Sequence, residues 1–88
     1  MKTQDNGIIY LREYGRINLK LKECMEAKGI TRNALARQIN TRFEVIDRWY
    51  KNNVEVIDLD ILARICFVFS CSVSDILEYN KPETDEYK

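Results

Sequence analysis

One stretch decides the fold of this chain: residues 31–50, TRNALARQINTRFEVIDRWY. It reads as two short helices joined by a tight turn. Thr31 can cap a helix that runs to about Ile39, because its side-chain oxygen can accept a hydrogen bond from a free amide at the helix start. Asn40 follows where the chain must turn, and Asn tolerates left-handed backbone angles better than any residue except Gly. The second helix is predicted to begin near Arg42.

The apolar residues of this stretch fall on one face of each predicted helix, because residues three and four positions apart share a helix face. They are Leu35, Ala36 and Ile39 in the first helix, and Val45, Ile46 and Trp49 in the second. We expect these faces to pack together, as in a helix-turn-helix. The side chains of the second helix that point away from its apolar face are then the candidate reading surface. They are Phe43, Glu44, Asp47, Arg48 and Lys51.

Length and charge limit the classes of protein to which this chain can belong. Eighty-eight residues make one domain, at a size where folding buries only about 60% of the surface that the unfolded chain exposes, so a partner subunit would add stability. The formal net charge is zero, which argues against a simple polycation. The charge is uneven, however: residues 15–53 carry nine basic and four acidic side chains, a net +5, whereas residues 54–88 carry three basic and eight acidic ones, a net −5. This asymmetry is typical of a molecule that meets phosphates at one end.

Several classes are disfavoured by composition. No run of about 18 apolar residues exists and the N-terminus lacks a signal-peptide pattern, so we expect a cytoplasmic, nucleoid-associated protein. The three cysteines (Cys24, Cys66 and Cys71) form no C-x-x-C pair and the chain has no histidine, so we expect small buried thiols, no metal and no cofactor. Without histidine, a glycine-rich phosphate loop or a recognisable acid pair, we do not expect an enzyme.

Before this stretch, the sequence predicts one strand and one helix. Ile8–Leu11 is β-prone and too apolar to stay in water, so it reads as a strand. Its partner is either the segment around Leu77–Tyr79 or the same segment of a second chain, and the sequence leaves both open. The first helix is predicted from about Leu19 to Lys28, with Asn18 as its cap and Gly29 closing it.

After the stretch, the sequence predicts two further helices. Asp58 can cap a helix from Leu59 to about Phe69. Its predicted buried residues are Leu59, Leu62, Ile65, Cys66 and Phe69. Ser72 and Asp75 fit a capping box for a short fifth helix, which carries Ile76 and Leu77 into the core and ends at Lys81-Pro82.

The predicted fold class is therefore all-α: a bundle of five short helices with a small N-terminal strand. The predicted organisation is a flexible lead with the short strand over residues 1–15, a helix-turn-helix domain over 16–80 and a disordered charged tail over 81–88.

The chain resembles a known family in the order and spacing of five features. These are Lys28-Gly29-Ile30-Thr31, Leu35-Ala36-Arg37, Ile46, Leu59-Asp60-Ile61-Leu62 with Ile65-Cys66, and Asp75-Ile76-Leu77-Glu78-Tyr79. From about Ile17 to Glu78 it is similar to the lambda-repressor-like, XRE-type helix-turn-helix transcriptional regulators, most closely the small stand-alone bacterial ones. The resemblance implies a five-helix lambda-repressor-like DNA-binding bundle that binds double-stranded DNA in a sequence-specific manner, as a homodimer.

The resemblance also implies site residues. In this family the third helix enters the DNA major groove and the start of the second helix rests on the DNA backbone. The implied base-reading residues are Arg42, Phe43, Glu44, Asp47 and Arg48. The implied phosphate-binding residues are Thr31, Arg32, Asn33, Arg37, Lys51 and Asn52. The side chains suit these roles, because Arg48 could bind guanine, Phe43 could pack on a thymine methyl and Glu44 could accept from a cytosine amine.

A second interpretation stays open: a protein-interaction module, antitoxin-like or an adaptor, with weak or no DNA binding. The zero net charge, the carboxylates of Glu44 and Asp47 on the reading face, and a spare strand at Ile8–Leu11 that could dock on a sheet edge favour it. Arg48 could equally pair with Glu44 four positions earlier on the helix, and Phe43 could be a dimer contact.

Overall fold

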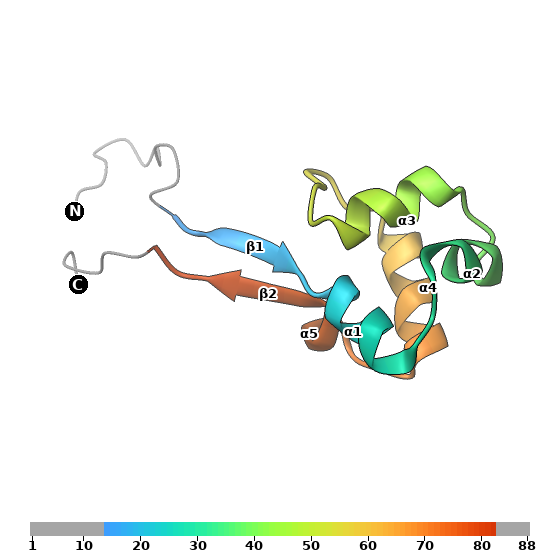
Figure 1. Cartoon of the computed structure of the whole chain (residues 1–88). Helices are drawn as coiled ribbons and strands as arrows, with labels where there is room; N and C mark the ends of the chain where they lie inside the picture. The colour runs from blue at the N-terminus through green and yellow to red at the C-terminus, as the bar shows by residue number, and fades with distance from the viewer. Residues whose placement is uncertain (1–13, 83–88) are drawn as a thin grey trace.

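The computed structural model describes residues 14–82, which form five helices and a two-stranded antiparallel ribbon (Figure 1). In chain order the elements are β1 (Arg16–Leu19), α1 (Leu21–Lys28), α2 (Arg32–Gln38), α3 (Phe43–Tyr50), α4 (Leu59–Phe69), α5 (Val73–Ile76) and β2 (Leu77–Asn80). The predicted class, a bundle of five short helices with a small strand component, is confirmed. No helix in this part of the chain has the length and apolar character needed to cross a membrane.

One apolar core joins all five helices. Each helix contributes a side chain that is fully buried: Leu21, Leu35, Ile46, Ile65 and Ile76 in order from α1 to α5. Trp49 is also buried, as its position on the Ile46 face predicted. The complete buried set is Leu19, Leu21, Met25, Leu35, Ala36, Ile39, Ile46, Trp49, Ile61, Leu62, Ile65, Phe69 and Ile76. Burying each large side chain contributes about 1.5–3 kcal/mol, so the helices are stabilised by one another rather than by their own short lengths.

Side chains cap the starts of α2, α4 and α5, as predicted. Thr31 Oγ1 accepts a hydrogen bond from the Ala34 amide at 3.1 Å, and an Asp58 carboxylate oxygen accepts one from the Asp60 amide at 2.9 Å. Ser72 and Asp75 form the capping box of α5. These three caps satisfy backbone amides that have no partner inside the helix.

The ribbon corrects two predicted helix boundaries. The first helix begins at Leu21 rather than Leu19, and its N-cap residue, Lys20, makes no side-chain capping bond. The fifth helix ends at Ile76 rather than at Lys81-Pro82, because β2 follows directly. In the ribbon, Leu19 pairs with Leu77. This pairing joins segments from opposite ends of the chain, so no local sequence pattern reports it.

Three asparagines connect the ribbon to the end of α3. The Asn52 side chain accepts a hydrogen bond from the Leu19 amide at 2.9 Å and donates one to Asn18 Oδ1 at 2.9 Å. The Asn18 side chain in turn donates to Asn80 Oδ1. Asn18 was predicted to cap the first helix; instead its side chain is part of this network, which fixes β1 next to the last turn of α3.

The predicted strand at Ile8–Leu11 and most of the predicted tail, residues 83–88, lie outside the described residues. The segment around Leu77, named as one partner of that strand, pairs with β1.

The buried face of α4 differs from the prediction at its first residue. Leu59 is 75% exposed, whereas Ile61, Leu62, Ile65 and Phe69 are buried. A helix turns about 100° per residue, which places Leu59 roughly 100° from the centre of the stripe formed by the other four. The prediction that Leu59 is buried was therefore wrong, and Ile61 takes its place.

Two glycines with left-handed backbones give a matched test of the ribbon. Gly15 has φ +83°, and a Cβ there would lie 2.3 Å from the Asn80 carbonyl oxygen; Gly29 has φ +70° and open space around it. We expect Gly29→Ala to cost only the left-handed strain of about 1–2 kcal/mol. We expect Gly15→Ala also to separate β1 from β2, because the contact is with backbone.

Hydrogen exchange of the β1 and β2 amides measures this difference. It should accelerate in Gly15→Ala relative to Gly29→Ala. Equal protection of the ribbon in both variants would contradict the register described here.

Candidate nucleic-acid interface

The helices α2 and α3 are held at a fixed angle by the turn between them. Asn40 adopts the predicted left-handed conformation, with φ 58°. The amide of Thr41 donates a hydrogen bond to the Ala36 carbonyl at 2.9 Å, which closes the end of α2. Leu35 on α2 and Ile46 on α3 are both fully buried below the turn. The outer face of α3 is therefore presented by a rigid support.

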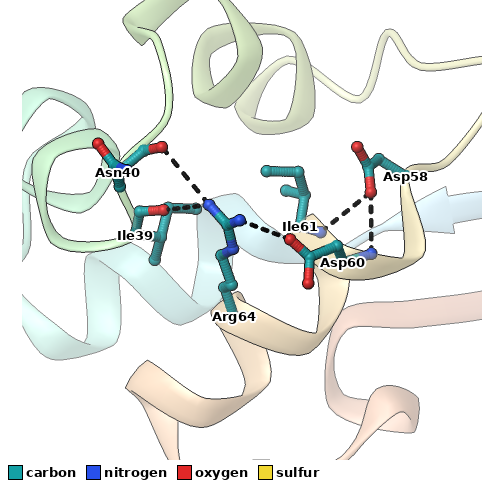
Figure 2. Close-up of polar contacts among 6 residues, drawn as sticks. All are labelled: Ile39, Asn40, Asp58, Asp60, Ile61 and Arg64. Atoms are coloured by element: carbon teal, nitrogen blue, oxygen red, sulfur yellow. Dashed lines mark hydrogen bonds and ion pairs between the residues drawn. The ribbon is translucent and has the colours of Figure 1, made fainter.

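Arg64 ties this turn to α4 (Figure 2). Its Nη1 donates to the Ile39 carbonyl at 2.7 Å and to the Asn40 carbonyl at 3.4 Å, and its Nη2 lies 2.6 Å from an Asp60 carboxylate oxygen. A cation at the C-terminal carbonyls of a helix is favourable, because those oxygens lack helical partners and carry partial negative charge. Sequence reasoning missed Arg64. The only local signal was the Asp60–Arg64 spacing of four residues, which says nothing about α2.

Most of the predicted base-reading residues lie exposed along α3. Arg42 is the N-cap residue of α3, and Arg42, Glu44 and Arg48 are all exposed. Phe43 is 39% exposed, at the outward start of the helix as predicted. In residues 14–82 Arg48 forms no ion pair with Glu44, so the helical pair considered from sequence is not formed.

Asp47, the fifth predicted reader, is placed differently. Its Oδ1 lies 2.6 Å from Arg32 Nη1 and its Oδ2 lies 3.1 Å from Lys51 Nζ. Hydrogen bonds from Lys51 and then Arg32 hold the pKa of Asp47 below its ordinary value of 3.8. A lowered pKa means that this pairing stabilises the fold above about pH 4 and is lost as the pH falls through the folded-state value.

The same arrangement fixes Arg32, a predicted phosphate-binding residue. Its guanidinium carbon lies 5.7 Å from the centre of the Phe43 ring and 4.6 Å from that of the Tyr50 ring. Phe43, Asp47 and Tyr50 follow one another at spacings of four and three on α3, so Arg32 reaches from α2 across one face of α3. Cation–π contacts of this kind each contribute about 0.5–1 kcal/mol at exposed sites.

Lys22 belongs to this surface, although sequence reasoning did not single it out. Its Nζ lies 5.7 Å from the centre of the Tyr50 ring, and the Tyr50 hydroxyl donates to Glu26 on the same helix at 3.4 Å. Three cations from three helices thus gather around Tyr50 and Asp47. We refer to Lys22, Arg32 and Lys51 as the basic patch. The family resemblance had indicated Arg32 and Lys51, but no sequence signal could have added Lys22, because the three meet only after α1, α2 and α3 pack.

The remaining predicted phosphate-binding residues differ in whether their side chains are already engaged in hydrogen bonds within the protein. Asn33 and Arg37 are exposed on α2, and Thr31 uses its hydroxyl to cap that helix. Asn52 uses its side-chain oxygen and nitrogen to hold β1. The assignment of these residues to phosphates stays a prediction.

The three cysteines are partly buried free thiols beside the core. Burial, followed by the neighbouring Cys66 thiol, raises the pKa of Cys71 to about 11, so Cys71 is protonated at neutral pH. Within residues 14–82, no three His, Cys, Asp or Glu side chains are grouped so as to hold a metal ion.

The fold and the exposed α3 define a helix-turn-helix domain. The profile of the Cro/C1-type helix-turn-helix DNA-binding domain matches residues 20–82, so the chain belongs to that family.

Two crystal structures of similar fold bear out the architecture. One is of a candidate DNA-binding protein from Bacteroides fragilis, with a TM-score of 0.64 and 21% identity over 72% of this chain and 100% of that chain. The other is of the transcriptional regulator VanUg, with a TM-score of 0.64 and 21% identity over 84% of this chain and 96% of that chain. No curated protein matches the sequence.

The Arg64 contact predicts a specific loss of stability. We expect Arg64→Met, which keeps most of the apolar stem, to lower the free energy of unfolding by about 1–2 kcal/mol, because charge-assisted hydrogen bonds to the end of α2 are lost at a partly exposed site. Asp60→Asn is the control, since it leaves the contact with α2 intact and removes a surface ion pair worth about 0.2–1 kcal/mol together with a charge at the start of α4.

Urea unfolding followed by circular dichroism gives both values. If the two variants lose the same small amount, the contact of Arg64 with the turn does not stabilise α2.

Proposed function

We propose that this protein is a transcriptional regulator that binds double-stranded DNA in a sequence-specific manner, with α3 in the major groove. The observation that carries the proposal is the juxtaposition of an exposed, polar outer face of α3 with the adjoining basic patch. Base edges are read from the groove while cations bind the flanking phosphates, and this surface offers both groups at once.

The exposed side chains of α3 suit the major groove. Arg48 has the planar guanidinium that matches the two acceptors of guanine, Glu44 can accept from a cytosine amine, and the Phe43 ring can pack on a thymine methyl. Arg42 is the N-cap residue of α3, and in helix-turn-helix proteins the N-terminal residues of the recognition helix contact base edges. The rigid turn below these residues supports the proposal, because readout requires a fixed side-chain geometry.

The proposed regulator acts in the cytoplasm, on the nucleoid, as a homodimer on a two-fold symmetric site, and as a binding protein rather than an enzyme. An exposed apolar pair on the ribbon supports contact with a second chain: Ile17 and Tyr79 face each other across the strands and are 53% and 55% exposed. The structural similarity to VanUg, a transcriptional regulator, supports the proposed role in transcription.

A protein-interaction module is the second candidate, and the same exposed pair favours it, because Ile17 and Tyr79 could contact a different protein. The two candidates differ in what purified protein binds. A regulator retrieves duplex DNA, whereas an adaptor retrieves one stoichiometric protein partner and no duplex.

Selection of random duplexes with the purified protein tests the proposal. We expect enriched sequences with two inverted half-sites about one helical turn apart, as two-fold docking requires. The affinity should fall steeply with salt, since each phosphate neutralised adds about 0.9 to the slope of log K against log salt concentration. Failure to enrich any sequence, or binding insensitive to salt, would refute sequence-specific binding.

Two variants separate reading from phosphate binding in that assay. Arg48→Ala should lose about 1–3 kcal/mol of preference at one base pair per half-site, because a bidentate contact is removed. Arg32→Ala should weaken all duplexes alike and lower the salt slope. If Arg48→Ala instead weakened binding to all duplexes equally, Arg48 would not be a base-reading residue.

A further inference from the structure

We propose that Asp47 is a positioning residue that holds Arg32 and Lys51 as a fixed pair of phosphate-binding cations, and that it does not read bases. This inference rests on the proposed function and assigns Asp47 a role within the same DNA-binding surface. It is motivated by the contacts of both carboxylate oxygens.

The carboxylate of Asp47 is divided between two cations. Oδ1 lies 2.6 Å from Arg32 on α2, and Oδ2 lies 3.1 Å from Lys51, the C-cap residue of α3 four positions further on. The Asp47 side chain is 22% exposed, whereas those of Arg32 and Lys51 are 38% and 63% exposed. The carboxylate is thus the covered member of the cluster and the two cations are the outer ones. Both carboxylate oxygens already contact a cation, so a base could bind Asp47 only by sharing an oxygen with Arg32 or Lys51.

Arg32 keeps donors for a phosphate while it is held. A guanidinium has five N–H donors, and Asp47 binds through Nη1 alone. Within residues 14–82, Arg32 makes no other side-chain hydrogen bond. Its contacts with the Phe43 and Tyr50 rings further restrict where the guanidinium can move. Arg32 is therefore presented in one orientation with its second edge unoccupied.

Two opposing effects decide what Asp47 does to DNA affinity. Its negative charge repels phosphates, so removing the charge would strengthen binding to DNA. Its contacts also restrain two of the most flexible side chains in proteins, so less conformational entropy is lost when DNA binds. Exposed charges are strongly screened by water and salt. Asp47 lies behind its two cations, so we infer that restraint outweighs repulsion.

Glu44 provides a matched comparison on the same helix. It is exposed and forms no ion pair within residues 14–82. Glu44→Gln and Asp47→Asn remove the same charge from the same face, three residues apart. Charge repulsion alone predicts that both variants bind DNA more tightly, whereas positioning predicts opposite signs.

The experiment measures binding to a random-sequence duplex, where base reading makes no contribution, by fluorescence anisotropy over a range of salt concentrations. We expect Asp47→Asn to bind about threefold to tenfold more weakly than the natural chain, the range set by two partly exposed ion pairs. Glu44→Gln should bind more tightly, because it removes a charge that repels phosphates and a random-sequence duplex offers Glu44 no defined base to read. Asp47→Glu, which keeps the carboxylate, should recover most of the loss.

A background that lacks both cations separates positioning from a general effect on folding. In a chain with Arg32→Met and Lys51→Met, adding Asp47→Asn should no longer weaken binding, because no cation remains to be held. Thermal unfolding of each variant confirms that the compared chains are folded.

Three results would overturn the inference while leaving the proposed function intact. They are binding by Asp47→Asn as tight as that of the natural chain, an equal loss in Glu44→Gln, or a loss that persists in the double-methionine background. Absence of duplex binding by the natural chain would instead refute the proposed function, and this inference with it.

Discussion

The hydrogen bonds from the Arg64 guanidinium to the last carbonyls of α2 are the contact on which the presentation of α3 depends. Helix α2 has seven residues, too few to be stable alone, and it must stop at Asn40 so that the chain can turn. Stopping exposes carbonyl oxygens without helical partners. Arg64 satisfies those of Ile39 and Asn40 from α4, the longest helix, while Ile65 beside it fills the core. One helix therefore supports the turn through a polar and an apolar contact at adjacent positions.

Features coded by neighbouring residues could be predicted from the sequence, and features made by distant ones could not. The caps at Thr31 and Asp58, the left-handed Asn40 and the buried Trp49 each follow from residues within a few positions of one another. The ribbon could not be predicted, because the pairing of Leu19 with its partner joins opposite ends of the chain.

The site shows the same division between local and distant contacts. Helical spacing allowed Arg48 to pair with Glu44, but within residues 14–82 that pair is not formed. Asp47 pairs instead with Lys51, four positions further on, and with Arg32, fifteen positions away on another helix. Helical spacing identifies which residues of one helix can form an ion pair. Whether a cation on a neighbouring helix competes for the same carboxylate depends on how the helices pack. The outward face of α3 was therefore predictable as a face, whereas the partner of each side chain on it was not.

Acidic side chains on the outer face of α3 were the strongest sequence argument against DNA binding, and the structure weakens it. Asp47 is compensated by two cations, which leaves Glu44 as the one exposed carboxylate in α3. The network around Asn52 has a further geometric consequence. Because Asn52, in the turn that follows α3, is hydrogen-bonded to β1, the exposed Ile17 on β1 keeps a constant position relative to the outer face of α3. A second chain bound at Ile17 would accordingly be held at a defined distance from α3, as two half-sites at a fixed spacing require.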